Sequence, residues 1–462
     1  MTNEPLTHQF KLSLFVYSNL MRLLAPILRI KAYTRGQREP GYLHAVGERF
    51  AHYDQTSHSA VQRFANGAIW IHAVSLGETK AAHVLVKAIM ERGDDLAEEP
   101  RFLLTHSTAT GRQAGLELIE SLGLDEHSAL QVWYPWDTPG AVKRFLKQFK
   151  PKLGLLMETE VWPNMVLACQ NAHIPLVLVN ARMNDKSFKS ALALGNFART
   201  IYQRLTAVFA QAPSDEERLK ALGAPVKASI GNIKFDASVD HEQLRRGKEF
   251  AATYYAASQK RIVLFASSRE GEEALLFQAL IANRTLTEGV QWLIVPRHPQ
   301  RFDEVKKLGL QFGLTVSKRI NPVIDSDAGI YFEQENTSHP LLPQIWMGDT
   351  VGEMPLYYAM ASAALLGGSF ERLGGQNLIE AAACACPVVM GPHVFNFSQA
   401  AQQSIQTGAA LQTQTLHEAC QLACKIALNP SRQTDMSNLA LAFASQNRGA
   451  VMQTLRLLKS YI

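Results

Sequence analysis

Cysteine is scarce in this chain of 462 residues, and that scarcity bounds the setting in which the protein works. Its five cysteines, Cys169, Cys384, Cys386, Cys420 and Cys424, lie in apolar, helix-like surroundings and form no Cys-x-x-Cys pair. Disulfide scaffolds and zinc ribbons require paired, regularly spaced cysteines. Because the sequence also shows no cleavable signal pattern, it predicts a reducing cytoplasmic setting with plain core cysteines.

Several catalytic signatures are missing as well. The sequence has no G-x-x-x-x-G-K-[ST] loop, no H-E-x-x-H, no G-x-S-x-G elbow and no early G-x-G-x-x-G with a downstream acid. These absences argue against a nucleotide-hydrolysing motor, a zinc protease, an esterase and a typical NAD enzyme. Basic residues are not interleaved with aromatic ones, so no nucleic-acid partner is expected. With no carboxylate cluster in the C-terminal half, no metal or cofactor is expected either.

The rest of the composition is typical of a globular protein, and the chain is long enough for two domains. Hydrophobic residues make up 47% and charged residues 19% of the chain, and this length exceeds one ordinary core. Short apolar runs alternate with helical stretches, which is typical of parallel α/β folds. Strands are expected in two series, at 68–74, 101–105, 130–134, 153–158, 176–180, 207–211 and 226–230, then at 261–267, 291–296, 314–317, 344–348, 363–367 and 387–390. The polar segment 236–246 is interpreted as the linker.

This alternation predicts an α/β fold of two doubly wound, Rossmann-like domains that face each other across a cleft. In such folds the ligand-binding loops lie at the carboxyl ends of the strands. Functional side chains are therefore sought where the predicted strands end.

Most of the formal net charge of +5 lies near the N-terminus, where residues 1–50 hold seven Lys or Arg against three acids. Residues 10–30 are long enough to cross a bilayer, yet Lys11, Ser13, Asn19 and Arg22 interrupt them. An amphipathic segment of this kind suits a helix in the headgroup layer, where basic residues meet anionic lipids. A helix packed on the core of the first domain is the alternative.

A glycine-rich loop, from Gly367 to Asn377, joins an apolar run at 361–366 to an Ala-rich helix. Glycines let the backbone approach an anion closely, and the N–H groups at a helix start attract negative charge. A nucleotide or sugar phosphate is therefore the first ligand to consider. The alternative is a turn that only packs the helix on the strand.

Other polar groups also follow predicted strands. In the first half they are Ser75, Gly77 and Glu78, then Glu158 and Glu160 beside Trp162, then Arg182 with Lys186. Carboxylates accept hydrogen bonds from sugar hydroxyls, an indole covers apolar C–H edges, and cations bind anionic oxygens. In the second half, Arg297, His298 and Arg301 surround two prolines that stiffen their loop. Helix-start or surface roles remain open for each group.

Eight motifs, in order and spacing from about residue 20 to 455, resemble the 3-deoxy-D-manno-octulosonic acid (Kdo) transferases of lipopolysaccharide synthesis. They are HAVSLGE (72–78), METEVWPN (157–164), NARMNDKS (180–187), GNIKFD (231–236), SSREGEE (267–273), PRHPQRF (296–302), GDTVGEM (348–354) and GGQNLIEAA (374–382). The chain departs from the family pattern at Arg269 and Gln376, where His is more usual, and at Leu378, where Pro is more usual.

The resemblance implies a B-type glycosyltransferase that transfers Kdo from CMP-Kdo to the lipid A precursor, lipid IVA, with inversion, at the cytoplasmic face of the bacterial inner membrane. Its implied parts are a membrane-anchor helix (1–35), an acceptor domain (36–238), a CMP-sugar domain (239–445) and a C-terminal helix (446–462). The implied partners are CMP-Kdo, the lipid A precursor and an anionic membrane surface.

The resemblance also implies roles for individual residues. Glu48, in Gly47-Glu48-Arg49, matches the family's general base. The implied donor contacts are Lys234, Ser268, Arg297, His298, Gly352, Glu353, Met354, Asn377 and Glu380, and the implied acceptor contacts are Ser75, Gly77, Glu78, Glu158, Glu160 and Arg182. Two alternatives stay open: another B-type sugar-nucleotide transferase or epimerase, and a non-catalytic scaffold at a membrane surface.

Overall fold

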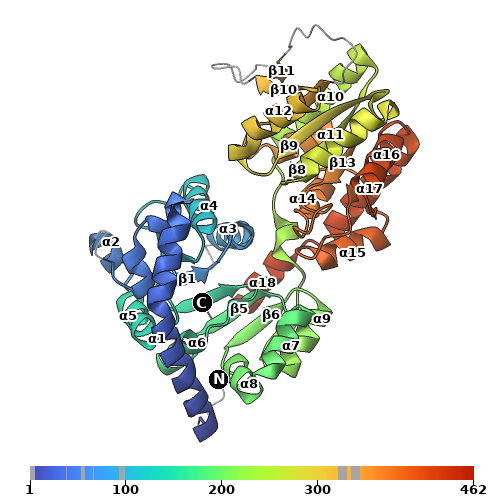
Figure 1. Cartoon of the computed structure of the whole chain (residues 1–462). Coiled ribbons are helices and arrows are strands. Elements are labelled where there is room, and N and C mark those ends of the chain that lie inside the picture. Colours follow the sequence, from blue (N-terminus) through green and yellow to red (C-terminus); the bar gives the residue numbers. More distant parts are fainter. Residues whose placement is uncertain are drawn as a thin grey trace. The chain divides into compact units, whose positions relative to one another are not determined.

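The structure, a computed structural model, describes residues 6–37, 39–53, 58–65, 67–92, 99–320, 330–333 and 344–461. Arg38, one of the N-terminal basic residues, lies outside these ranges. The chain divides into two compact units, unit 1 (Met1–Ala237 and Arg448–Ile462) and unit 2 (Ser238–Asn447). The end of the chain therefore belongs to the first unit, as its red terminal helix in Figure 1 indicates.

Unit 1 is built on a parallel sheet of strand order β3-β2-β1-β4-β5-β6-β7. Its strands are β1 (Ile69–His72), β2 (Phe102–His106), β3 (Ala129–Trp133), β4 (Leu153–Met157), β5 (Leu176–Ala181), β6 (Ala207–Ala210) and β7 (Val226–Ser229). Its helices are α1 (His8–Gly36), α2 (His58–Arg63), α3 (Leu76–Met90), α4 (Ala109–Ser121), α5 (Pro139–Phe149), α6 (Pro163–Asn171), α7 (Asp185–Ala193), α8 (Asn196–Tyr202), α9 (Pro213–Ala221) and α18 (Ala450–Leu458). Short 3-10 helices are η1 (Pro40–Leu43), η2 (Val46–Phe50) and η4 (Ile233–Asp236). All seven strands expected in the first series are confirmed.

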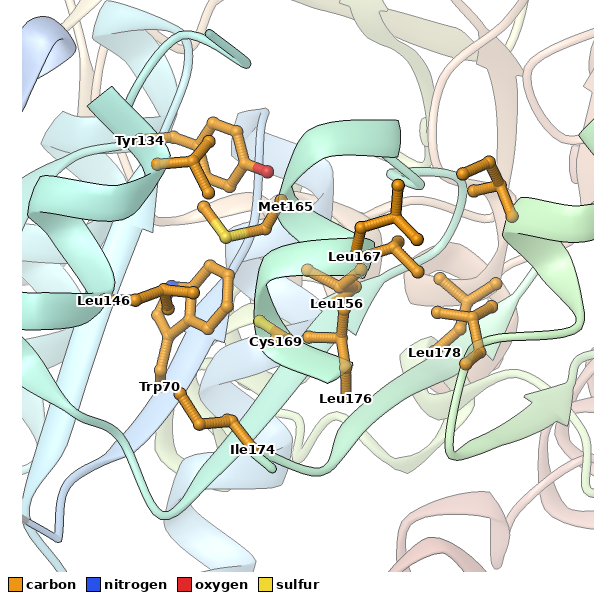
Figure 2. Close-up of a cluster of buried hydrophobic side chains, with 14 of the residues drawn as sticks. Trp70, Tyr134, Leu146, Leu156, Met165, Leu167, Cys169, Ile174, Leu176 and Leu178 are labelled. Atoms are coloured by element: carbon orange, nitrogen blue, oxygen red, sulfur yellow. The ribbon is translucent and has the colours of Figure 1, made fainter. Parts of the chain in front are cut away.

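The strands of unit 1 consist of mostly apolar residues because helices cover the sheet and bury them. Figure 2 shows Met165 and Cys169 of α6 packed against Trp70, Leu156 and Leu176 of the sheet. All five side chains are at most 2% exposed. Full burial of a large apolar side chain contributes about 1.5–3 kcal/mol, so this packing holds the strand ends, and the loops that follow them, in place.

Unit 2 has an eight-stranded sheet of order β11-β10-β12-β9-β8-β13-β14-β15, in which only β11 runs antiparallel. Its strands are β8 (Arg261–Ser268), β9 (Val290–Pro296), β10 (Thr315–Ile320), β11 (Tyr331–Phe332), β12 (Gln344–Met347), β13 (Ala363–Leu366), β14 (Val388–Met390) and β15 (Ala410–Gln412). Its helices are α10 (His241–Ser258), α11 (Glu272–Ala282), α12 (Phe302–Gln311), α13 (Met354–Met360), α14 (Leu378–Ala383), α15 (Ser398–Gln406), α16 (Leu416–Ala427) and α17 (Pro430–Gln446), with η5 (Arg284–Thr287) and η6 (Pro299–Arg301).

The six strands expected in unit 2 are confirmed, but the predicted linker was too long and two strands were missed. β11 and β15 have two and three residues, too few to show a period. Segment 236–246 was wrongly interpreted as linker throughout, because α10 begins at His241. Asp240 caps that helix by accepting from the N–H groups of Glu242 and Gln243, so its polar start is a helix terminus.

The strand orders define one topological switch point in each unit. In unit 1 the chain moves outward from β1 through β2 to β3 and then returns to the other side of β1 as β4. In unit 2 β8 lies between β9 and β13. Ligands of open α/β sheets bind at the carboxyl ends of the strands at such points. Ligand-binding groups are therefore expected in the loops after β1 and β4, and after β8 and β13.

Helix α1 is only partly packed on unit 1. Phe10 stacks on Phe197 with ring centroids 5.5 Å apart, the Tyr17 hydroxyl donates to Asp137 Oδ2 (2.9 Å), and the Ser18 hydroxyl donates to Asn164 Oδ1 (2.9 Å). Eight other apolar side chains are more than half exposed: Leu12, Phe15, Val16, Leu20, Leu23, Ile27, Ile30 and Tyr33. Among the described residues, α1 alone is long and apolar enough to cross a membrane, judged by length and composition.

Candidate active site

At the switch point of unit 1, two carboxylates and a lysine meet. Glu78, in the first turn of α3, accepts from the N–H of Val74 (2.7 Å) and from the Ser75 hydroxyl (3.3 Å). Glu158, just after β4, accepts from Lys234 Nζ (2.5 Å). A Cβ added at Gly77 would lie 3.9 Å from the same Nζ. The structure thus brings Gly77, Glu158 and Lys234 together, and it puts Lys234 in unit 1, whereas the other expected donor contacts are in unit 2.

Burial raises the pKa of two acids at this switch point, Glu78 and Glu160. Burial, and then the negative charge of Glu158, raises the pKa of Glu78 to about 8, although the N–H of Val74 opposes this. The carboxyl of Glu78 therefore holds a proton at neutral pH. Burial also raises the pKa of Glu160, whose Oε2 accepts from Trp162 Nε1 (2.7 Å). Shifted acids grouped at a strand end mark a functional-site candidate.

Two residues at this sheet edge are held in the left-handed backbone region, Glu158 (φ 58°) and Asn180 (φ 52°). Such a conformation costs a non-glycine residue about 1–3 kcal/mol. Asn180 is fully buried, and its Oδ1 accepts from the N–H of Ile233 (3.0 Å), next to Lys234. The N–H of Arg182 donates to the carbonyl of Glu158 (3.0 Å). The ends of β4 and β5 and the turn that carries Lys234 are therefore joined by hydrogen bonds.

Glu48 lies elsewhere in unit 1, in η2. Its Oε2 accepts from Arg112 Nη1 of α4 (2.9 Å) and from the N–H of Trp133 in β3 (2.8 Å), and the residue is only 2% exposed. The guanidinium of Arg49 lies 3.8 Å from the centroid of the Trp133 ring. Glu48 is therefore a buried carboxylate held by a guanidinium of α4 and a backbone N–H of β3.

In unit 2 the glycine-rich loop connects β13 to α14 at the switch point. A Cβ at Gly367 would come within 2.1 Å of the carbonyl oxygen of Ser267, so this glycine allows two loops to pack closely. Gly374 has a φ of 91°, which favours glycine. Asn377 caps α14 by accepting from the N–H of Ile379 (3.1 Å), and Glu380 follows in the first turn. Packing and loop shape thus account for part of the glycine content.

A half-buried cation lies beside this loop. The N–H of Arg297 donates to the carbonyl of Ser268 (2.9 Å), while its side chain lies in the field of Glu380 and Arg269. Burial lowers the pKa of Arg297, and Glu380 acts in the opposite direction. Burial also lowers the pKa of His298. Within the described residues we find no hydrogen bond from the Arg297 guanidinium, so its planar donors can receive an anionic ligand.

The other expected donor contacts have protein partners. Ser268 is fully buried and donates to Glu273 Oε1 (3.0 Å). After β12, Gly352 (φ 84°) accepts through its carbonyl from Gln243 Nε2 (3.2 Å). Glu353 forms an ion pair with Arg319, and Met354 begins α13. Ser268 and the Glu353 carboxylate are therefore engaged in holding the loops.

Sequence reasoning missed three charged residues that support the expected sites. Arg112 pairs with Glu48, and Arg319 of β10 pairs with Glu353. Asp137, 1% exposed, accepts from the N–H groups of Asn164 and Met165 at the start of α6 (2.9 Å each). All three lie outside the eight motifs, so nothing in the sequence distinguished them. The described residues contain no group of three His, Cys, Asp or Glu side chains able to hold a metal ion.

Two doubly wound units define the class, a two-domain fold of the B-type glycosyltransferase architecture. Solved structures share this fold: HepE from Anabaena in complex with UDP (TM-score 0.55, 14% identity) covers 86% of this chain and 100% of its own. A glycosyltransferase from Rickettsia africae has the same TM-score at 12% identity, with 86% and 99% covered.

Sequence comparisons identify the family. The family model described as 3-deoxy-D-manno-octulosonic-acid transferase (kdotransferase) matches residues 44–237. A 3-deoxy-D-manno-octulosonic acid transferase from Bordetella pertussis is 38% identical over 97% of this chain and 99% of its own. One from Haemophilus influenzae is 29% identical over 97% and 98%. The chain belongs to the 3-deoxy-D-manno-octulosonic-acid transferase family and is a glycosyltransferase.

Proposed function

We propose that this chain transfers Kdo from CMP-Kdo to the lipid A precursor lipid IVA, in lipopolysaccharide core synthesis. An acceptor hydroxyl oxygen attacks the anomeric carbon of Kdo, the bond from that carbon to the CMP phosphate oxygen breaks, and a base takes the hydroxyl proton. The transition state resembles an oxocarbenium ion. The observation that carries the proposal is 38% sequence identity to a Kdo transferase over 97% of this chain.

The donor site in this proposal is the switch point of unit 2. The leaving phosphate develops negative charge, which a desolvated cation stabilises most effectively. Arg297 supplies that cation, the loop N–H groups near Gly374–Asn377 supply donors, and Glu380 can accept from ribose hydroxyls. The support is the burial of Arg297 beside Glu380 and the position of both at the carboxyl ends of the strands.

The acceptor site extends along the carboxyl edge of the unit-1 sheet, from the switch point to the end of β3, where Glu48 is the general base. Glu158, Glu160 and the protonated Glu78 offer acceptors and one donor to sugar hydroxyls. Glu48 is almost fully buried, so the groups that cover it must move before an acceptor hydroxyl can reach it.

We further propose that α1 lies on an anionic membrane at its cytoplasmic face. Its exposed apolar side chains form a surface larger than a soluble helix ordinarily presents, and Lys11, Arg22 and Arg29 lie among them. Apolar side chains enter the acyl boundary while basic ones meet lipid phosphates. A lipid-linked acceptor would then be met at the surface that holds it.

The decisive experiment is incubation of the full chain with CMP-Kdo and the tetra-acylated lipid A precursor, followed by mass analysis for each added Kdo. The expected result is a product heavier by one or more Kdo, with release of CMP. Turnover of a UDP-sugar in place of CMP-Kdo would support the other sugar-nucleotide enzymes. Lipid binding with no turnover would support a scaffold.

The donor assignment is tested by Arg297→Ala and Glu380→Ala. Each should weaken CMP binding by roughly 1–3 kcal/mol, because each removes a charge-assisted hydrogen bond. Isothermal titration with CMP measures the effect. Exposed Arg432 of α17, changed to Ala, is the matched control and should bind CMP as the unaltered chain does. A folded Arg297 or Glu380 variant with unchanged affinity removes that residue from the site.

A further inference from the structure

Two adjacent glutamates at the start of α11, Glu272 and Glu273, are completely buried. Buried carboxylates persist only where hydrogen bonds or opposite charges compensate their lost hydration. Both side chains have such partners, and the partners come from the three loops that surround the switch point of unit 2. None of the proposed ligand contacts includes either glutamate.

Glu272 joins the loop after β8 to the loop after β13. Its Oε2 accepts from the N–H groups of Gly368 (2.7 Å) and Arg269 (2.9 Å), and its Oε1 accepts from the N–H of Phe370 (2.9 Å). One carboxylate thus determines the course of the glycine-rich loop just after it leaves the sheet.

Glu273 joins the loop after β8 to the loop after β9. It forms a bidentate pair with Arg301, Nη1 to Oε1 at 2.7 Å and Nη2 to Oε2 at 3.2 Å, and accepts from the Ser268 hydroxyl. The loop that carries Arg297 is therefore held at both ends, by the carbonyl of Ser268 at Arg297 and by Glu273 at Arg301.

The strand order explains how Glu272 and Glu273, which are neighbours in sequence, reach loops on opposite sides of β8. β8 lies between β9 and β13 in the sheet, and α11 follows β8 directly. Consecutive helical residues point about 100° apart around the axis. Glu272 is thus directed to the loop after β13, and Glu273 to the loop after β9.

We propose that Glu272 and Glu273 are positioning residues for the donor site, which set Arg297 and the glycine-rich loop in the geometry that binds the CMP phosphate. The proposal rests on the function proposed above. Neither glutamate needs to touch the donor, since each acts through the backbone or the side chain of a loop residue. Supporting residues of this kind alter affinity by about 10–100-fold around metal sites, and a phosphate site likewise needs its binding groups held in place by supporting contacts.

The test compares Glu272→Gln and Glu273→Gln with Glu418→Gln in the full chain. Glu418, in the first turn of α16 in unit 2, also accepts from backbone N–H groups, those of Gln414 and Thr415 just before the helix. The loop that precedes α16 is not one of the three loops at the switch point. Measurements are CMP affinity by titration, melting temperature, and KM for CMP-Kdo and for the lipid acceptor. We expect CMP affinity to fall about tenfold or more in the first two variants, with a matching rise in KM for CMP-Kdo alone, and no change in Glu418→Gln.

Folded Glu272 and Glu273 variants that bind CMP as tightly as the unaltered chain would overturn the proposal, as would a lowered melting temperature with unchanged affinity. Should Glu273→Gln not fold, Arg301→Lys disturbs its bidentate pair and keeps a cation beside the carboxylate. Should Glu272→Gln not fold, Glu272→Asp shortens the side chain that reaches the three N–H groups and keeps its charge, and the same criteria apply. Failure of the unaltered chain to bind CMP would instead overturn the proposed function, and this assignment with it.

Discussion

At the scale of single residues, the environment of Glu48 sets up the clearest test of the mechanism. Glu48→Gln keeps the size and the contact with the N–H of Trp133 but cannot take a proton. We expect transfer to fall by about 10²–10⁴-fold, the usual contribution of a general base, while CMP affinity stays unchanged because the donor site is in unit 2. A transfer assay and a CMP titration measure both effects.

The melting curve of Glu48→Gln separates a catalytic role from a structural one. Loss of the charge beside Arg112 lowers stability somewhat, so Arg112→Gln serves as the matched control, since it breaks the same ion pair and leaves the carboxylate. If Glu48→Gln transfers Kdo nearly normally, another base acts. Glu158 and Glu160 are the next candidates, whereas Glu78 could act as a base only after losing the proton that it holds at neutral pH.

The raised pKa of Glu78 predicts a pH-dependent stability. Burial raises this pKa from 4.5 to about 8, so the folded protein binds a proton that the unfolded chain releases. The stability that protonated Glu78 contributes is therefore full below about pH 4.5 and is lost progressively as the pH rises from there through 8. Glu78→Gln, which needs no proton, should become more stable than the unaltered chain over that range, by roughly 1.4 kcal/mol for each step of one in pH.

Urea unfolding midpoints between pH 5 and pH 9 measure this difference. Glu117→Gln, which changes an exposed acid of α4, is the control. Its urea midpoint should differ from that of the unaltered chain by the same amount at every pH. A Glu78→Gln offset that is equally constant with pH would mean that Glu78 ionises normally in the folded protein.

At the scale of elements, α1 has some side chains that contact the rest of unit 1 and a set of apolar side chains that are exposed. Removing residues 1–30 would also take Phe10 from the core and leave Asp137 and Asn164 without Tyr17 and Ser18. Changing Phe15, Leu23, Ile27 and Ile30 to Gln spares those contacts. We expect this variant to lose at least about tenfold in affinity for vesicles of anionic phospholipid, since each buried apolar side chain contributes about 1.5–3 kcal/mol.

Vesicle flotation measures the binding, and CMP titration shows that unit 2 is unaffected. Leu439→Gln with Leu441→Gln, two exposed leucines of α17, is the matched control and should float as the unaltered chain does. Undiminished flotation of the α1 variant would show that α1 does not make the membrane contact.

At the scale of the whole molecule, the last helix belongs to the first unit. Asp236 accepts from the N–H of Gly449 and, at 2.7 Å, from the N–H of Val451, and Leu458 of α18 is fully buried in the unit-1 core. A chain ending at Asn447 should therefore lose several degrees in the melting transition of unit 1, since removing a buried Leu alone costs about 2–5 kcal/mol.

Because Ser238–Asn447 is intact in that truncation, CMP affinity should be unchanged. Calorimetry and CMP titration on the same preparation measure both. Asp236→Asn is a milder change than the truncation, because it weakens the hydrogen bonds from the N–H groups of Gly449 and Val451 without removing α18. Loss of CMP binding with an unaltered melting curve would contradict the assignment of this helix to unit 1.

The sequence by itself determined the strands, the α/β class and the family. Buried parallel strands must be continuous apolar runs, since both faces of the sheet are covered. Each strand can therefore be located from its own stretch of sequence. The motifs at strand ends are equally local, because each is a single stretch of chain. The two strands that were missed are too short to carry a period, and the acidic start of α10 has the composition of a linker.

Only the tertiary structure decided which of these motifs act together. Lys234 belongs with Glu158, Arg301 with Glu273, and Glu353 with Arg319, and each pair joins residues from different motifs or from outside them. Strand order governs such pairings, and it depends on how the whole sheet packs. The buried state of Glu48 and the raised pKa of Glu78 have the same origin, because desolvation is a property of surrounding atoms that no single stretch of sequence contains.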